Sequence, residues 1–216
     1  DFGFKLNGKK LFLKGISNHH DLGAVGVAAF DRAIERQFQL MKRFGYNHIR
    51  SSHNPYSESF LKLADKYGMK FYFGLYDSGR YWDTGDLSWE IEDNKYVIDE
   101  VWQQYGSKHK SFGGWYISGE ISRATKGAID AFHAMGKQCK DVSDGLPTFI
   151  SPWIDGKKAV MASGSKLTKA DAVSVDEHER EWNEIFDGIH DVVDACAFQD
   201  GHIDYDELDE IGRASC

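Results

Sequence analysis

Near the middle of the chain, residues 112–122 read FGGWYISGEIS. The apolar run at 115–117 lies between glycines and stops at small residues, which are followed by the carboxylate of Glu120. This pattern is typical of a buried parallel strand that delivers one acid to the end of a sheet. Glu120 is therefore the first candidate for a catalytic acid. The alternatives at this position are a cap for the following helix and an ion pair with Arg123.

Outward from this segment, apolar strands and amphipathic helices alternate about every 30 residues, which is the rhythm of βαβ units. Strands are expected near residues 15–21, 46–50, 69–77, 112–118, 147–153 and 192–200, and helices near 31–44, 58–67, 93–105, 129–142 and 175–189. A hairpin precedes them, because Asn7-Gly8 supplies the positive φ angles of a tight turn. The fold class is therefore α/β, with a parallel sheet.

The element order predicts a (β/α)₈ TIM barrel that is incomplete. A complete barrel takes about 250 residues, whereas only about six βα strands are found here beside the N-terminal hairpin. An open doubly wound sheet is the runner-up, but no Gly-rich phosphate loop follows the first strand. Because no Pro- or Ser-rich linker divides the chain, we expect one domain over residues 1–211, with 212–216 as a tail or a scar.

The composition excludes several classes of function. The 216 residues are 41% hydrophobic with a formal net charge of −8, and the basic residues are scattered, so no nucleic-acid partner is expected. No apolar run approaches the roughly 18 residues of a membrane span, so no membrane partner is expected either. The start of the chain has neither a signal-peptide pattern nor an initiator Met. The sequence does not indicate the localisation.

No metal site or cofactor is expected from the sequence. Cys139, Cys196 and Cys216 lack the C-x-x-C spacing of a zinc site. Residues 200–207 resemble the second half of an EF-hand loop, but the alignment places Cys196 and Phe198 at positions one and three, where oxygen ligands are required.

Polar or aromatic residues follow all six expected strands, and in a parallel barrel these carboxyl ends form the active site. The residues are His19, His20, Asp21, Arg50, Ser52, His53, Asn54, Tyr76, Asp77, Glu120, Trp153, Asp155, Gln199 and Asp200. A sugar site requires this mixture: acids for proton transfer, polar groups for hydroxyls and aromatic faces for the sugar ring. Trp82, Trp115 and Trp153 are the stacking candidates, although Trp115 could equally be core.

Residues 1–70 resemble the start of the catalytic barrel of glycoside hydrolase family two, the β-galactosidase and β-glucuronidase family. The matching motifs are FKLNGK at 4–9, LKG at 13–15, NHHDLG at 18–23, IRSSHNP at 49–55 and LADKYGM at 63–69. The resemblance implies that His19, His20, Arg50, His53 and Asn54 bind the sugar.

Residues from about 66 to 211 are more similar to an uncharacterised family of bacterial glycosidase-like TIM barrels. The matching motifs are GLYDSGRYW at 74–82, GWYISGEIS at 114–122 and AFQDG at 197–201. This change of resemblance along the chain suggests the hypothesis of a fusion. It also departs from family two, because Gly119 stands where that family has an Asn before the acid/base Glu, and the seventh strand with the nucleophile is not reached. Asp77 or Asp200 would then be the second carboxylate.

Two hypotheses of function follow. The first is a β-galactosidase-like glycoside hydrolase acting on β-linked sugars, with Glu120 as general acid/base and Asp77 or Asp200 as nucleophile or base. The alternative is a non-catalytic carbohydrate-binding or structural fragment of a glycosidase barrel. The substrate-binding candidates are His19, His20, Asp21, Arg50, His53, Asn54, Tyr76, Trp82, Trp153 and Gln199. Unpaired strand edges predict a homodimer or higher oligomer.

Overall fold

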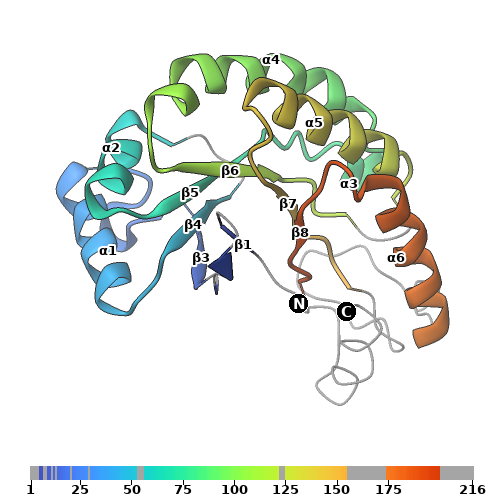
Figure 1. The fold of residues 1–216 in the computed structure, drawn as a ribbon, viewed down its shortest axis with the longest axis horizontal. Helices are drawn as coiled ribbons and strands as arrows, with labels where there is room; N and C mark the ends of the chain where they lie inside the picture. Colours follow the sequence, from blue (N-terminus) through green and yellow to red (C-terminus); the bar gives the residue numbers. More distant parts are fainter. Residues whose placement is uncertain are drawn as a thin grey trace. The chain divides into compact units, whose positions relative to one another are not determined.

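The computed structural model describes residues 5–6, 9–10, 12, 14–19, 21–28, 30–52, 56–121, 125–154 and 174–199. The chain divides into two compact units, of which the first comprises Asp1–Leu75 and Asp99–Tyr116 and the second Tyr76–Ile98 and Ile117–Cys216. Each unit combines parallel strands with helices (Figure 1). The single domain over residues 1–211 stays a prediction.

The first unit is built on parallel strands. They are β3 (Gly15–Asn18), β4 (His48–Ser51), β5 (Lys70–Gly74) and β6 (Phe112–Ile117). Each strand pairs with the next one along the chain, and Ile49 of β4 is in register with Ile16 of β3 and Phe71 of β5. The predicted hairpin is present as β1 (Lys5–Leu6) and β2 (Lys9–Lys10), which pair antiparallel.

Two amphipathic helices, α1 (Asp31–Arg43) and α2 (Glu58–Tyr67), pack side by side in the same unit (Figure 1). The ring of Phe60 on α2 lies 4.9 Å from Phe38 of α1 and 5.1 Å from Phe71 of β5. All three rings are buried, so a continuous aromatic core joins both helices to the sheet.

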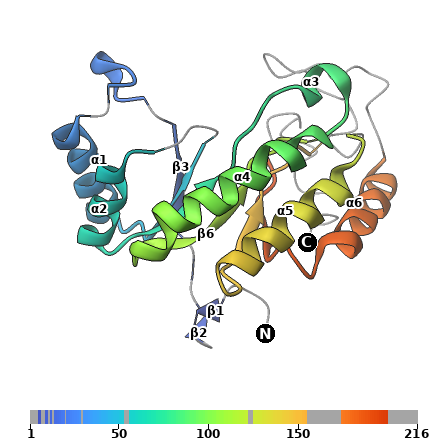
Figure 2. The ribbon, with the colours of Figure 1, turned by 90° about the horizontal axis from the view of Figure 1, so that it is seen from above.

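The second unit contains β7 (Thr148–Ile150) and β8 (Ala195–Cys196), which pair in parallel. The helices α5 (Ala128–Val142) and α6 (Val175–Ile189) lie side by side (Figures 1 and 2), and α5 contacts β7. Trp182 of α6 meets Phe198 edge to face, with the ring centroids 4.8 Å apart. The remaining helices are α3 (Tyr81–Thr84), α4 (Trp89–Gln104), η1 (Gly23–Val25) and η2 (Gly106–Lys108).

The predicted fold class is confirmed: the protein is α/β, of the incomplete TIM-barrel type, and the described residues form six strands after the hairpin. One local expectation was wrong: helix α4 begins earlier than expected, at Trp89, because the Asp86 carboxylate accepts the backbone N–H of Ser88 at 2.9 Å. Of the two roles left open for Trp115, the structure favours the core, because this residue is fully buried 4.9 Å from the Phe112 ring. Among the described residues, no helix is long and apolar enough to cross a membrane.

Candidate active site

In the second unit, one tyrosine hydroxyl connects the two segments that carry the candidate carboxylates. Tyr81, at the start of α3, donates to Asp77 Oδ2 at 3.0 Å and accepts the backbone N–H of Glu120 at 2.9 Å. Its side chain is held in the core, with the residue only 4% exposed. The Asp77 carboxylate and the backbone N–H of Glu120 therefore both form a hydrogen bond with the Tyr81 hydroxyl oxygen.

The electrostatics of Tyr81 suit this role. Burial, followed by the negative charge of Asp77, raises the pKa of the Tyr81 hydroxyl above its ordinary value. The hydroxyl therefore keeps its proton at neutral pH. A protonated hydroxyl can donate to a carboxylate and accept an N–H at the same time, as the two distances require.

Asp77 lies in the loop that follows β5, and both of its oxygens accept hydrogen bonds. Oδ1 accepts the backbone N–H of Gly79 at 2.8 Å, and Oδ2 accepts the Tyr81 hydroxyl. Gly79 has a φ of 69°, a left-handed conformation that glycine adopts without steric cost. Two donors thus set the direction of the carboxylate.

Glu120 follows β6 through two tightly packed residues, Ser118 and Gly119. A Cβ atom at Gly119 would lie 3.3 Å from Leu87 and 3.6 Å from Phe132. The packing therefore leaves little room for the Asn that glycoside hydrolase family two places before its acid/base. A larger residue at this position would require the Leu87 side chain to shift.

Trp153 and Gln199 lie next to each other at the ends of β7 and β8, where they form a parallel bridge. The side-chain Nε2 of Gln199 donates to the carbonyl of Ser151 at 2.7 Å. The backbone N–H of Trp153 donates to the carbonyl of Ile121 at 2.8 Å, which ties this strand end to the segment that carries Glu120. The Gln199 side chain therefore forms a hydrogen bond within the protein, in addition to the sugar-binding role predicted for it.

The candidates of the first unit lie at the ends of β3 and β4. The Arg50 guanidinium stands over the Tyr116 ring, 4.2 Å from its centroid, which is a cation–π contact. Asp21 Oδ1 accepts the backbone N–H of Gly23 at 2.8 Å, and the carbonyl of His19 accepts the backbone N–H of Asp21 at 2.6 Å. His20, His53, Asn54 and Asp200 lie outside the described residues.

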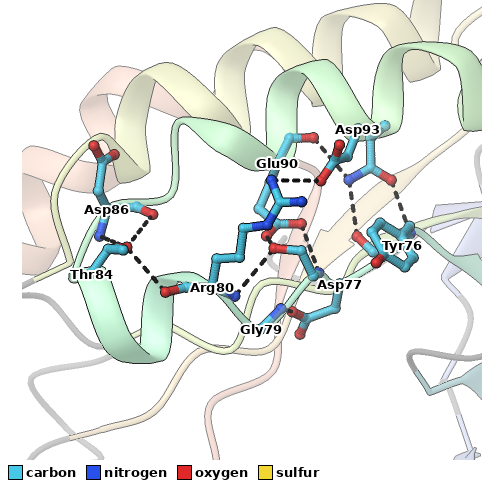
Figure 3. Close-up of polar contacts among 10 residues, drawn as sticks. Tyr76, Asp77, Gly79, Arg80, Thr84, Asp86, Glu90 and Asp93 are labelled. Carbon is cyan, nitrogen blue, oxygen red and sulfur yellow. Dashed lines mark hydrogen bonds and ion pairs between the residues drawn. The ribbon is translucent and has the colours of Figure 1, made fainter.

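Sequence reasoning missed Tyr81, Glu90 and Asn94. The last two lie on the first turns of α4 and form hydrogen bonds with the loop that carries Asp77 (Figure 3). Residues four apart lie on the same face of a helix, so the spacing of Glu90 and Asn94 could have paired them. The helix was expected to begin near residue 93, between the two residues, so the pair was not noticed. Within the part of the chain that the structure describes, no group of three or more His, Cys, Asp or Glu residues could hold a metal ion.

Parallel strands with carboxylates after their carboxyl ends define a protein of the incomplete TIM-barrel type. The chain belongs to the family described as "Domain of unknown function (DUF4434)", whose model matches residues 15–215. This match runs through residues 66–70, where the two resemblances meet. The fusion stays a hypothesis.

The relatives confirm the resemblance to glycoside hydrolase family two. The chain is 48% identical over 66 residues to the β-galactosidase BoGH2A of Bacteroides ovatus, covering 31% of this chain and 8% of that protein. It is 28% identical over 161 residues to a β-glucuronidase of Bacteroides fragilis, covering 72% of this chain and 23% of that protein. The chain thus spans less than a quarter of the length of either curated relative.

One solved structure is similar to this protein over most of the length of both chains. It comes from Bacteroides thetaiotaomicron and is described as "a putative alpha-L-fucosidase". The sequences are 60% identical, the TM-score is 0.80, and the match covers 94% of this chain and 71% of that one.

Proposed function

We propose that the protein is a glycoside hydrolase that acts on β-linked sugars, with Glu120 as general acid/base and Asp77 as the second carboxylate. The observation that carries this proposal is the Tyr81 hydroxyl, which binds Asp77 and the backbone of Glu120 within one unit. Similarity to β-galactosidases and β-glucuronidases supports the reaction class.

In the proposed reaction, the Glu120 carboxyl donates its proton to the glycosidic oxygen as the C–O bond breaks, and the bonding electrons stay on the leaving oxygen. In the first course Asp77 bonds to the anomeric carbon in this step, and a water that gives its proton to Glu120 then displaces Asp77 from the sugar. In the second course Asp77 removes a proton from the water that attacks the anomeric carbon. A carboxyl separation of about 5 Å corresponds to the first course, with retention, and about 6.5–9.5 Å to the second, with inversion. Asp200 is the alternative for this second role.

Aromatic side chains near Asp77 supply surfaces for a sugar ring. Tyr76 is 48% exposed and Trp82 is 37% exposed, and both belong to the segment that contains Asp77 and Tyr81. Exposed aromatic faces of this kind can pack against the C–H side of a sugar. The proposal keeps the binding roles that the resemblance gives to His19, His20, Arg50, His53 and Asn54, and those that the strand ends give to Asp21, Trp153 and Gln199.

The proposal is tested by hydrolysis of aryl β-galactoside, β-glucoside, β-glucuronide and α-L-fucoside by the wild type, Glu120→Gln, Asp77→Asn and Asp200→Asn. We expect Glu120→Gln to lower kcat about 10²- to 10⁴-fold on a nitrophenyl β-glycoside, because the leaving oxygen no longer receives a proton. The loss in kcat/KM, which reports the bond-breaking step, should be much smaller on a dinitrophenyl glycoside, whose leaving group needs no proton. Glu100→Gln, on the exposed side of α4, is the control.

Each result has a distinct meaning. If Glu120→Gln and Glu100→Gln hydrolyse the nitrophenyl glycosides equally fast, Glu120 is not the acid. A larger loss in Asp200→Asn than in Asp77→Asn assigns the second carboxylate to Asp200. Sugar binding by a wild type that turns over none of these substrates would instead favour the carbohydrate-binding fragment.

A further inference from the structure

We propose that Glu90 and Asn94, on the first turns of α4, are positioning residues that hold the loop carrying Asp77 in its working conformation. The inference rests on the proposed function, because it assigns these residues to the Asp77 carboxylate. Both residues are buried, both belong to the second unit, and their hydrogen bonds go to the two residues on either side of Asp77 (Figure 3).

Asn94 holds the residue before Asp77. Its Oδ1 accepts the backbone N–H of Tyr76 at 2.9 Å, and its Nδ2 donates to the carbonyl of Tyr76 at 2.9 Å. Tyr76 has left β5, so its backbone groups have no strand partner, and the Asn94 amide takes that place. Asn94 is only 1% exposed, and Nδ2 also donates to the Glu90 carbonyl at 3.0 Å, which fixes the orientation of the amide.

Glu90 holds the residue after Asp77. Its Oε2 accepts the backbone N–H of Ser78 at 3.2 Å, and its Oε1 accepts the Ser78 hydroxyl. The Ser78 hydroxyl in turn accepts the backbone N–H of Arg80 at 3.2 Å, so the effect of one carboxylate extends through the turn. Asp77 is therefore held from both sides by one helix.

The charge of Glu90 argues against a purely structural role. Glu90 is only 3% exposed, and the negative charges of Asp77 on the loop and Asp93 on α4 act on its carboxyl group. Arg80 of the loop is the nearby cation, and it pairs with Asp93 at 3.8 Å. Burial, together with Asp77 and Asp93, raises the pKa of Glu90, while the Ser78 donors oppose this shift.

Burying a carboxylate beside two others costs free energy, because the group loses its hydration and is repelled by its neighbours. A neutral side chain of the same size would avoid both costs. Only an ionised carboxylate can accept the N–H and the O–H of Ser78 together without presenting a competing donor. This chemical need explains why an acid stands here. The Gln of Glu90→Gln can accept one of the two bonds, so this variant should keep part of the effect.

The test combines amide hydrogen exchange with steady-state kinetics for the wild type, Glu90→Ala, Glu90→Gln and Asn94→Ala. Glu92→Gln, on the exposed side of the same helix, is the matched control. We expect the Ser78 amide to exchange at least about 10-fold faster in Glu90→Ala and the Tyr76 amide at least about 10-fold faster in Asn94→Ala, because each variant removes the acceptor of that amide. We expect kcat to fall about 10- to 100-fold with KM nearly unchanged, since the misplaced group acts on the reaction step.

A pH profile adds a readout that simple destabilisation would not change. Protonation of Glu90 should lower kcat in the wild type and so produce one limb of the plot of kcat against pH. This limb should be missing in Glu90→Gln. In that variant kcat should lie between those of the wild type and Glu90→Ala. Thermal melts establish that each variant is folded. If Glu90→Ala does not fold, the separate variants Asn94→Ala and Glu90→Gln provide the test.

The outcomes separate this inference from the proposed function. Unchanged exchange at residues 76–80 in folded Glu90 and Asn94 variants overturns the inference. Faster exchange with unchanged kcat overturns the positioning role. A wild type that hydrolyses none of the substrates removes the proposed function, and exchange alone then decides whether α4 holds the loop.

Discussion

At the scale of single residues, Tyr81 supports the clearest expectation. Tyr81→Phe keeps the buried ring but removes the oxygen that binds Asp77 and the backbone N–H of Glu120. Leaving such groups without their partner costs about 1–3 kcal/mol, so the free energy of unfolding should fall by about this amount. Urea denaturation measures the change, and kcat should fall as well because Asp77 loses the hydroxyl donor that orients Oδ2.

Tyr96→Phe is the control for this prediction, because Tyr96 is 75% exposed on α4 and loses the same oxygen atom. Its unfolding free energy should stay within about 0.5 kcal/mol of the wild type. If Tyr81→Phe unfolds at the same urea concentration as Tyr96→Phe, the Tyr81 hydroxyl does not stabilise this region.

Residue patterns predicted part of the candidate site. Glu120 and Asp77 were candidates because any polar residue at the end of a parallel strand reaches the same edge of the sheet, and their catalytic roles stay predictions. Tyr81 could not be found in this way, because its two bonds depend on the path of the loop after β5, and no periodicity encodes that path. Trp115 was ambiguous for a related reason: an aromatic residue inside a strand has the same pattern whether it faces a site or the core.

At the scale of elements, the helix ends that carry capping residues were predicted best. Helix α2 runs over Glu58–Tyr67 as expected, because Ser57 accepts the backbone N–H of Phe60 at 3.3 Å and Gly68 adopts a φ of 60°. The predicted cap of α6 also forms, with Ser174 accepting the N–H of Glu177 at 3.2 Å. Helix α3 was not predicted, since four residues are too few to show a helical period.

The contact between α1 and α2 gives a prediction about pH. Glu35 on α1 accepts from Lys66 Nζ at 2.8 Å and the Tyr67 hydroxyl at 3.1 Å, both on α2, and from Arg32 at 2.7 Å. These bonds, with Lys66 the largest cause, lower the pKa of Glu35 from 4.5 to about 2. A lowered folded-state pKa means that the stabilisation is present above pH 4.5 and is lost as the pH falls towards 2.

Glu35→Gln should therefore remove part of the acid sensitivity of the fold. Between pH 4.5 and 2 the melting temperature of the wild type should fall more steeply than that of Glu35→Gln. The difference should shrink at high salt, because the ion pairs are partly exposed. Glu92→Gln serves as the control, and equal pH slopes for all three proteins would contradict the role of Glu35.

At the scale of the whole molecule, the sequence predicted the order and direction of the elements, because alternating strands and helices leave few topologies open. It did not predict the division into two compact units. The chain passes from one unit to the other after Leu75, Ile98 and Tyr116, and these points lie within or directly beside β5, α4 and β6, where no linker composition marks them.

The edges of the strands carry the last prediction, which concerns assembly. Among the described residues, β3 pairs with β4 alone and β8 pairs with β7 alone. Such edges leave backbone donors and acceptors available to another chain. We predict a homodimer that covers them, so light scattering should give about twice the 24.5 kDa mass of one chain.

A charged side chain on the edge should prevent this pairing, because burying it against another strand is unfavourable. Ser17→Lys places a charge at an exposed position of β3, and Ser107→Lys places the same charge at an exposed position of η2. The first variant should be monomeric and the second should remain dimeric. A wild type with the mass of one chain at all protein concentrations would show that the edges need no second copy.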